Sequence, residues 1–177
     1  MTSKLKTDVL ETVSGSGTIA LTNQLSGMTS ASMPSGSVLQ VVSATFGTNT
    51  STTSTSFVNT PVALSITPTS TSSKILIMVS TPMYAANANT YAARFTIFRG
   101  TVSGVNLGDS SLGFGNQWSS TGGTSLSVTA SMSFLDSPST TSSQAYTVGI
   151  RSEGNNSAAT IMQSNAKATI TLMEIKG

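Results

Sequence analysis

The 177 residues are enough for one domain, and the 8 basic and 6 acidic residues make up only 8% of them. Ser and Thr fill 62 positions, which excludes both a charge-rich disordered chain and a long helical protein. With a net charge of +2 and scattered basic residues, the sequence predicts no nucleic-acid partner. The longest strongly apolar run, residues 75–79, is too short for membrane insertion.

Residues 1–36 are predicted to form an N-terminal docking arm and linker. Two short extended stretches flank a Gly/Ser turn at residues 14–17, and Gly, Pro and Ser are frequent over 23–36. The apolar side chains that line the two stretches are Leu5, Val9, Val13, Ile19 and Leu21. Because an isolated two-stranded hairpin is marginal in water, we expect this arm to lie on another surface.

Residues 37–177 show apolar and polar side chains alternating at period two, which is typical of half-buried strands. The predicted strands cover residues 37–47, 57–66, 74–81, 91–100, 125–135, 144–152, 158–163 and 166–176. No window has a helical period. Eight strands predict an all-β, antiparallel two-sheet sandwich of jelly-roll type. The Ser/Thr-rich breaks at 48–56, 67–73 and 137–143 are predicted to be exposed loops.

The sequence carries no pattern of catalytic or cofactor-binding residues. It contains no His and no Cys, which removes the common zinc sites and any catalytic triad with an imidazole base. Ser164 and Lys167 have the spacing of a Ser–Lys pair, but before a strand they would point to opposite faces. The carboxylates outside the arm, Asp109, Asp136, Glu153 and Glu174, have ordinary turn or strand-end contexts. We therefore expect no enzyme, no cofactor and no metal.

The only Trp of the chain, Trp118, lies in a Gly-flanked stretch that we read as a loop between strands. Its large apolar face suits contact with a sugar or a protein, and Asn116 and Gln117 add neutral donors and acceptors beside it. Tyr84 and Tyr91 form a second candidate receptor or glycan contact. The alternative is that Trp118 fills the open end of the sandwich or a trimer axis.

Several segments, most of them in the first 45 residues, resemble a known group of proteins at the peptide level. The segments concerned are residues 3–13 (SKLKTDVLETV), 14–23 (SGSGTIALTN), 25–28 (LSGM), 34–42 (PSGSVLQVV) and 72–77 (SSKILI). They resemble tail-fibre-type virion structural proteins of marine tailed phages, including cyanophages. The resemblance covers about the first 45 residues closely and contains no active-site signature.

The C-terminal strands, residues 146–152 (YTVGIRS) and 168–175 (ATITLMEI), look like the last strands of tumour-necrosis-factor-like jelly rolls. That resemblance implies a compact homotrimer. The long charge-free stretches, above all residues 12–73, agree with it, because burial between subunits would cover apolar strand faces.

Together these features predict a non-enzymatic phage virion protein. It would be made in the host cytoplasm and displayed on the particle surface as a trimeric, outward-facing module for host attachment. Its partners would be its own copies, other virion proteins bound through the arm, and a host surface glycan or protein. The alternatives are a decoration protein on the phage head and a small glycan depolymerase.

Overall fold

Two antiparallel sheets form the protein in the computed structural model, which describes residues 32–86, 91–119, 125–154 and 158–177. The strands are β1 (Val38–Phe46), β2 (Thr50–Thr52), β3 (Val58–Ile66), β4 (Lys74–Ala86), β5 (Tyr91–Arg99), β6 (Val105–Asn106), β7 (Gly115–Ser119), β8 (Leu126–Asp136), β9 (Gln144–Ser152), β10 (Ala158–Ile161) and β11 (Ala168–Ile175). The arm residues Leu5, Val9, Val13, Ile19 and Leu21 lie outside the described residues.

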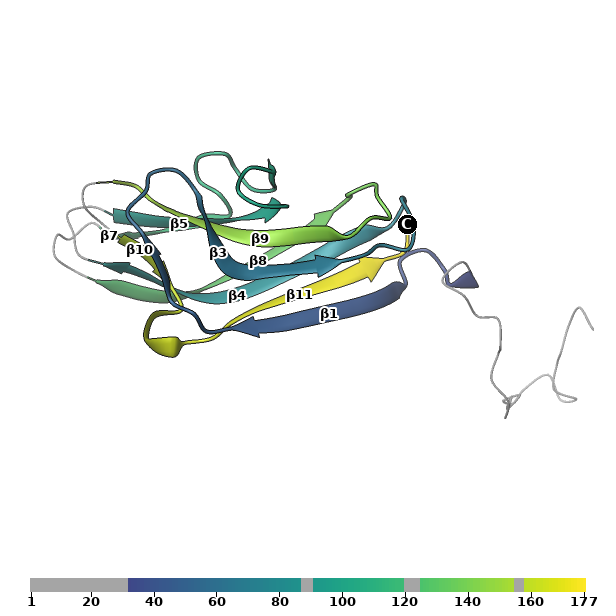
Figure 1. The fold of residues 1–177 in the computed structure, drawn as a ribbon, viewed down its shortest axis with the longest axis horizontal. Coiled ribbons are helices and arrows are strands. Elements are labelled where there is room, and N and C mark those ends of the chain that lie inside the picture. The colour runs from purple at the N-terminus through teal and green to yellow at the C-terminus, as the bar shows by residue number, and fades with distance from the viewer. Residues whose placement is uncertain (1–31, 87–90, 120–124, 155–157) are drawn as a thin grey trace, which may run out of the picture. The chain divides into compact units, whose positions relative to one another are not determined.

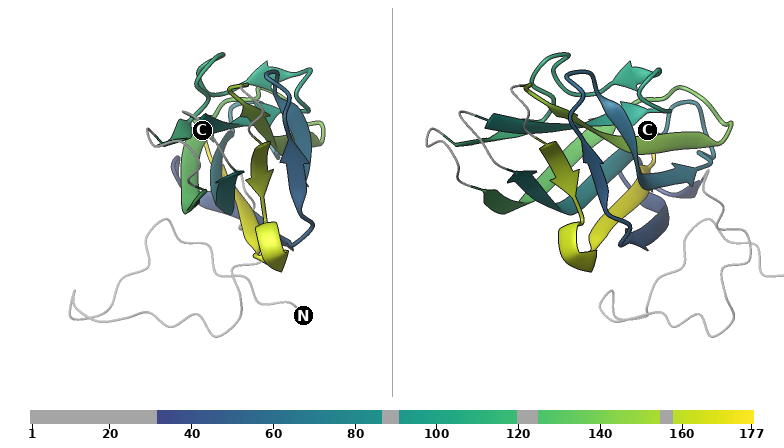
Figure 2. Two further views of the ribbon diagram at one scale, coloured as in Figure 1. Left: turned by 90° about the vertical axis from the view of Figure 1, so that its left-hand side faces the viewer. Right: turned by 60° about the vertical axis from the view of Figure 1, so that its left-hand side comes forward.

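Sheet A is built around the 13-residue strand β4. One edge of β4 pairs with β8, and the other pairs with β11 and then β10. β1 extends this sheet beside β11, and β2 extends it beside β10. Sheet B has the order β3–β9–β5, and the free edge of β5 pairs with β6 and β7. Figures 1 and 2 show the two sheets from three directions.

The strand order is that of a jelly roll. The main strands of sheet A run β1–β11–β4–β8, and those of sheet B run β3–β9–β5–β7, so the chain crosses repeatedly between the sheets. Eight antiparallel strands in two such sheets define the double-sheet jelly roll. The predicted all-β sandwich is confirmed.

The core lies between the sheets and follows the predicted alternation. Ile75, Ile77 and Val79 of β4 point inward, as do Ile170 and Leu172 of β11, and all five are buried. The buried apolar side chains of sheet B are Val62, Ile66, Ala93, Phe95, Ile97, Tyr146, Val148 and Ile150. The strands of sheet A mostly bury one face, whereas β5 and β9 in the middle of sheet B are largely buried on both faces.

Two predicted loops prove to contain strands. Residues 113–119 were expected to form a loop, but β7 runs from Gly115 to Ser119 and pairs with β5. The Ser/Thr-rich break at 48–56 likewise contains β2, which pairs with β10. Both segments are poor in apolar side chains, so only pairing with a distant strand makes them extended. Among the described residues, no helix has the length and apolar character needed to cross a membrane.

Candidate functional site

The outer face of sheet A carries a row of four apolar side chains, one from each main strand. The pairing register places Val41 beside Met173, Met173 beside Leu76, and Leu76 beside Leu135. Val41 is 52% exposed and Leu135 is 48% exposed. We name Val41, Met173, Leu76 and Leu135 the apolar row. These four positions face outward, where the surface of a sheet exposed to water would carry polar side chains.

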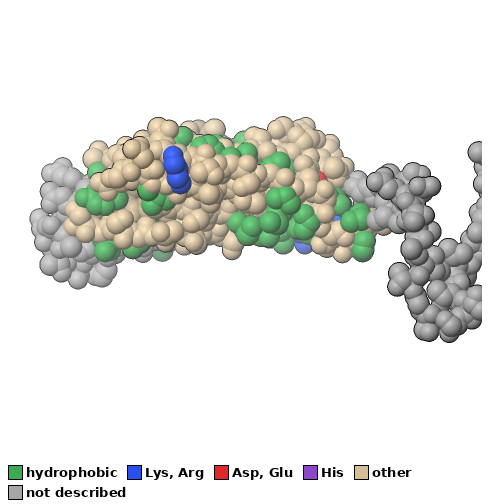
Figure 3. All heavy atoms as spheres, turned by 90° about the horizontal axis from the view of Figure 1, so that it is seen from below, with side chains coloured by type: hydrophobic (Ala, Val, Ile, Leu, Met, Phe, Trp, Pro, Cys, Tyr) green, Lys and Arg blue, Asp and Glu red, His purple; other side chains and the backbone are tan. Residues whose placement is uncertain are grey.

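The surroundings of the apolar row are apolar or hydroxylated, and the basic side chains of the face, Lys74 and Lys167, lie toward its ends. Exposed Val38 and Met78 adjoin it on β1 and β4. The outward positions farther along the four strands are Ser43, Thr45, Ser80, Pro82, Tyr84, Ser127, Thr129, Ser131, Ser133, Thr169 and Thr171. Figure 3 views the molecule from the side where β1 and β11 lie lowest in Figure 1; the largest group of hydrophobic side chains there forms a patch, and a basic side chain lies elsewhere on the same face.

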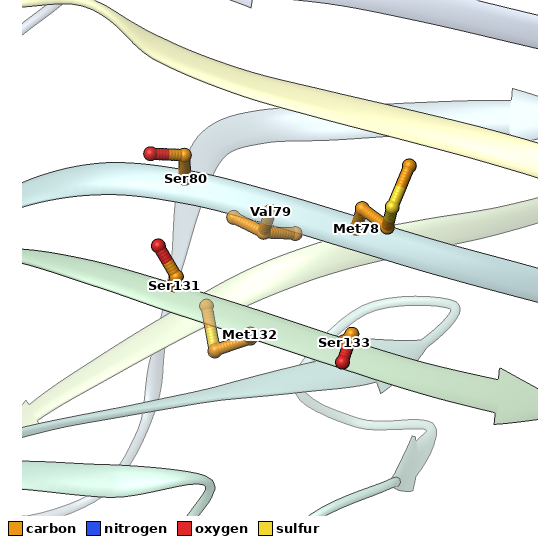
Figure 4. A pocket seen from close by; sticks show the side chains of 6 residues that line it. All are labelled: Met78, Val79, Ser80, Ser131, Met132 and Ser133. Carbon is orange, nitrogen blue, oxygen red and sulfur yellow. The ribbon is translucent and has the colours of Figure 1, made fainter.

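A hollow of about 330 Å³ lies beside the apolar row, between β4 and β8. Three serines, Ser80, Ser131 and Ser133, face it together with Met78, and their small side chains leave the space open (Figure 4). The hollow is shallow and mostly apolar in its lining. Its size suits a side chain inserted from a partner protein.

Glu174 is a buried carboxylate at the end of β11. Its Oε1 accepts hydrogen bonds from the Ser73 hydroxyl at 2.6 Å and from the Thr69 N–H and hydroxyl at 2.7 and 2.8 Å. Its Oε2 accepts one from the Gln40 amide at 2.6 Å. Burial by itself raises the pKa of Glu174, but these hydrogen bonds together lower it below the ordinary value. The carboxylate thus holds the β3–β4 loop against β1 and β11.

Asp136, at the end of β8, is the second buried carboxylate and joins the two sheets. Both of its oxygens accept hydrogen bonds from the Arg99 guanidinium of β5, one of them at 2.8 Å. The Tyr146 hydroxyl of β9 donates to Asp136 at 2.7 Å. Burial, together with this hydrogen bond, raises the pKa of Tyr146 well above its ordinary value. The ion pair raises the pKa of Arg99 as well.

The two remaining carboxylates of the described residues, Asp109 and Glu153, lie on the outer side of sheet B. Glu153 forms ion pairs with Arg94 and Arg151, the latter at 2.9 Å. Asp109 accepts hydrogen bonds from the N–H groups of Leu112 and Ser111, which lower its pKa. Each of the four carboxylates outside the arm therefore has basic, hydroxyl or amide partners among the described residues. The described residues contain no group of three acidic side chains that could hold a metal ion.

The predicted receptor residues divide between the two sheets. Tyr84 lies on β4 of sheet A, opposite Ser127 of β8. Tyr91 lies on β5 of sheet B, and Asn116, Gln117 and Trp118 lie on β7 beside it. Tyr91 pairs with Ser119 at the start of β5, so these four residues belong to neighbouring strands. Tyr84 and Tyr91, although close in sequence, are carried by different sheets.

The sequence interpretation missed two surface features, because it judged each residue by its chemical type and did not know which residues strand pairing brings together. The apolar row was hidden because its four members lie at positions 41, 76, 135 and 173, at least 35 positions apart along the chain, and meet only through strand pairing. The cluster of Arg94, Arg151 and Glu153 was hidden for the same reason. No protein-family model and no curated protein sequence matches this chain.

Proposed function

We propose that this protein is a non-enzymatic structural protein of a phage virion. In this proposal its jelly-roll domain self-associates into a homotrimer through the outer face of sheet A and is displayed outward for host attachment. The observation that carries the proposal is the apolar row, set in an otherwise nearly uncharged sheet face. The virion setting and the number of three subunits come from the sequence resemblances described above.

The composition of this face is the one expected of a protein–protein interface. Interface centres are depleted in charged residues and enriched in well-packed apolar groups, with a polar rim around them. Here the apolar row forms the centre and the hydroxyl side chains form the surroundings. Burying the exposed half of a Val or Leu side chain contributes about 1 kcal/mol, and a closed ring of subunits repeats the gain in every contact.

Self-association is tested by placing charges in the apolar row. The variant Val41→Glu/Leu135→Glu puts two carboxylates in the proposed interface. The control Val105→Glu/Leu112→Glu makes the same change at two positions outside sheet A with matching exposure, 53% and 50%. We expect light scattering to give three times the 18.0 kDa chain mass for the native protein and the control, and the single chain mass for the first variant.

A native protein that scatters light as a single 18.0 kDa species at micromolar concentration contradicts this proposal. So does a trimer that persists unchanged in Val41→Glu/Leu135→Glu. Circular dichroism of both variants checks that the β fold is retained, since all four sites are exposed and surface changes of this kind alter stability little.

The role of the arm is tested by deleting residues 1–31. The residues from Met33 to Gly177 form a compact unit by themselves. The start of this unit is tied to its end, because Gly36 N–H donates to the Lys176 carbonyl and Lys176 N–H to the Ser37 carbonyl, both at 2.8 Å. We expect the shortened protein to stay soluble and β-rich in circular dichroism but to be lost from purified particles. Unfolding of the shortened protein, or its normal incorporation, contradicts a docking arm.

A further inference from the structure

The outer face of sheet B, opposite the apolar row, is partly covered by loops, and an open pocket of about 400 Å³ lies among them. Its walls come from the β2–β3 loop, from β5 and β9, and from the segments on either side of β6. Phe98 and Arg151 point to the outer side of their strands, yet both are largely shielded from solvent by these loops. If trimers form through sheet A, this pocket faces away from the trimer.

The apolar wall of the pocket is held in a defined position. The rings of Phe57 and Phe98 meet edge to face with centroids 5.7 Å apart. Gly149 lies directly under Phe98, where a Cβ atom would come within 2.6 Å of the ring, so only glycine allows this close packing. Val102 completes the wall. A fixed aromatic wall of this kind is what binding sites use to receive the apolar face of a ligand.

Arg151 fixes the loops around the pocket. Its Nη1 donates to the Thr55 carbonyl at 2.8 Å, and its Nη2 donates to the Ser111 carbonyl at 2.5 Å. Its guanidinium also lies 5.4 Å from the centre of the Phe57 ring. One side chain thereby joins the β2–β3 loop, the β6–β7 loop and the aromatic wall. The pocket is formed before any ligand arrives, which reduces the entropy lost on binding.

The charges around the pocket balance. Arg94 and Arg151 lie directly opposite each other on β5 and β9, and Glu153 forms ion pairs with both. The carboxylate of Asp109 lies near enough for both arginines to lower its pKa further. Two basic and two acidic groups leave no net charge to attract an ionic ligand. The pocket is therefore suited to a neutral molecule.

Free hydroxyl groups surround the mouth of the pocket. The side chains of Thr55, Ser56 and Ser110 line it, are exposed, and make no hydrogen bond to any other residue that the structure describes. Each hydroxyl can donate one hydrogen bond and accept two. A ligand that fits must therefore combine an apolar face for Phe57 with several hydroxyl groups for these three side chains.

We propose that this pocket binds a neutral saccharide. A pyranose ring has an apolar C–H face and a rim of hydroxyl groups, which matches an aromatic wall beside free Ser and Thr hydroxyls. The volume lies at the small end of ligand pockets and suits one or two sugar rings. The proposal names a ligand class for the host-attachment function proposed above and rests on that function only for its biological setting.

The test uses the full chain on an array of neutral and acidic oligosaccharides, followed by NMR titration with the neutral compounds that bind. Ser110→Trp fills the pocket from an exposed loop, and Phe57→Leu removes the aromatic face while keeping an apolar side chain. Ser142→Trp makes the same change in the exposed β8–β9 loop, outside the pocket lining. We expect the first two variants to lose at least tenfold in affinity and Ser142→Trp to bind like the native protein.

Any one of several outcomes overturns the proposal. They are no saccharide binding by the native protein, binding that survives Ser110→Trp, and a preference for acidic over neutral oligosaccharides. Loss of binding in Trp118→Ala with full binding in Ser110→Trp would move the site to β7 and also overturn it. The variant Val41→Glu/Leu135→Glu separates this proposal from the trimer, since it should lose the trimer mass and keep the NMR-detected binding.

Discussion

Replacing Asp136 by alanine is expected to lower the free energy of unfolding by about 3 kcal/mol, more than any other single change considered for this protein. Asp136 is only 2% exposed and accepts hydrogen bonds from Arg99 and Tyr146. Its removal leaves the Tyr146 hydroxyl, which is fully buried, without a partner. Arg99 is 27% exposed, so its guanidinium regains water and the loss stays below that of a fully buried ion pair.

Urea denaturation measures this loss of stability. Two further variants show how much of it comes from the hydrogen bond between Asp136 and Tyr146. Tyr146→Phe removes one donor and should cost about 1 kcal/mol. In Asp136→Ala/Tyr146→Phe the buried hydroxyl is gone, so the double variant should be more stable than the sum of the single losses implies. A loss below 1 kcal/mol for Asp136→Ala, or strict additivity in the double variant, would show that the contact does not join the sheets energetically.

Glu174→Gln is expected to cost about 2 kcal/mol at neutral pH and to weaken the dependence of stability on acid. The amide keeps the shape of the carboxylate but offers one oxygen in place of two. That oxygen cannot satisfy the donors from Ser73, Thr69 and Gln40 together. Because Ser73 is buried, water cannot replace the hydrogen bond that its hydroxyl would lose.

The sign of the pH effect follows from the lowered pKa of Glu174. The folded protein binds this proton less readily than the unfolded chain, whose glutamate titrates near 4.5. The stabilisation is therefore complete above pH 4.5 and is lost as the pH falls through the lower folded pKa. Asp109, whose pKa is also lowered, acts in the same direction.

The measurement is a series of urea denaturation curves between pH 3 and pH 7 for the native protein and for Glu174→Gln, each run at matched ionic strength. Because Asp109 is present in both proteins, the difference between the two pH profiles isolates Glu174. The native protein should lose more stability than the variant below pH 4.5. Parallel profiles over the whole range would mean that Glu174 keeps an ordinary pKa in the folded protein.

The sequence by itself determined the fold class and most of the strands. Strict alternation over residues 126–134, and the two opposed sets of side chains over 168–175, indicate strands with one buried face, because the side-chain period of a strand is two. The predicted strand at 144–152 agrees with β9 at both ends. The local sequence is enough to predict these strands because each of them has apolar side chains along one face.

Only the tertiary structure decided which outward side chains meet. β7 and β2 are strands because the free edges of β5 and β10 pair with them. The local sequences of these two segments do not by themselves predict a strand. The buried carboxylates Asp136 and Glu174 find their partners on other strands and in a loop, and Arg151 at the pocket finds its partners in two other loops. The apolar row exists because pairing places one apolar residue from each of four strands side by side. Register between distant strands is set by how the whole core packs, so a surface site built across strands is fixed only when the sheet is complete.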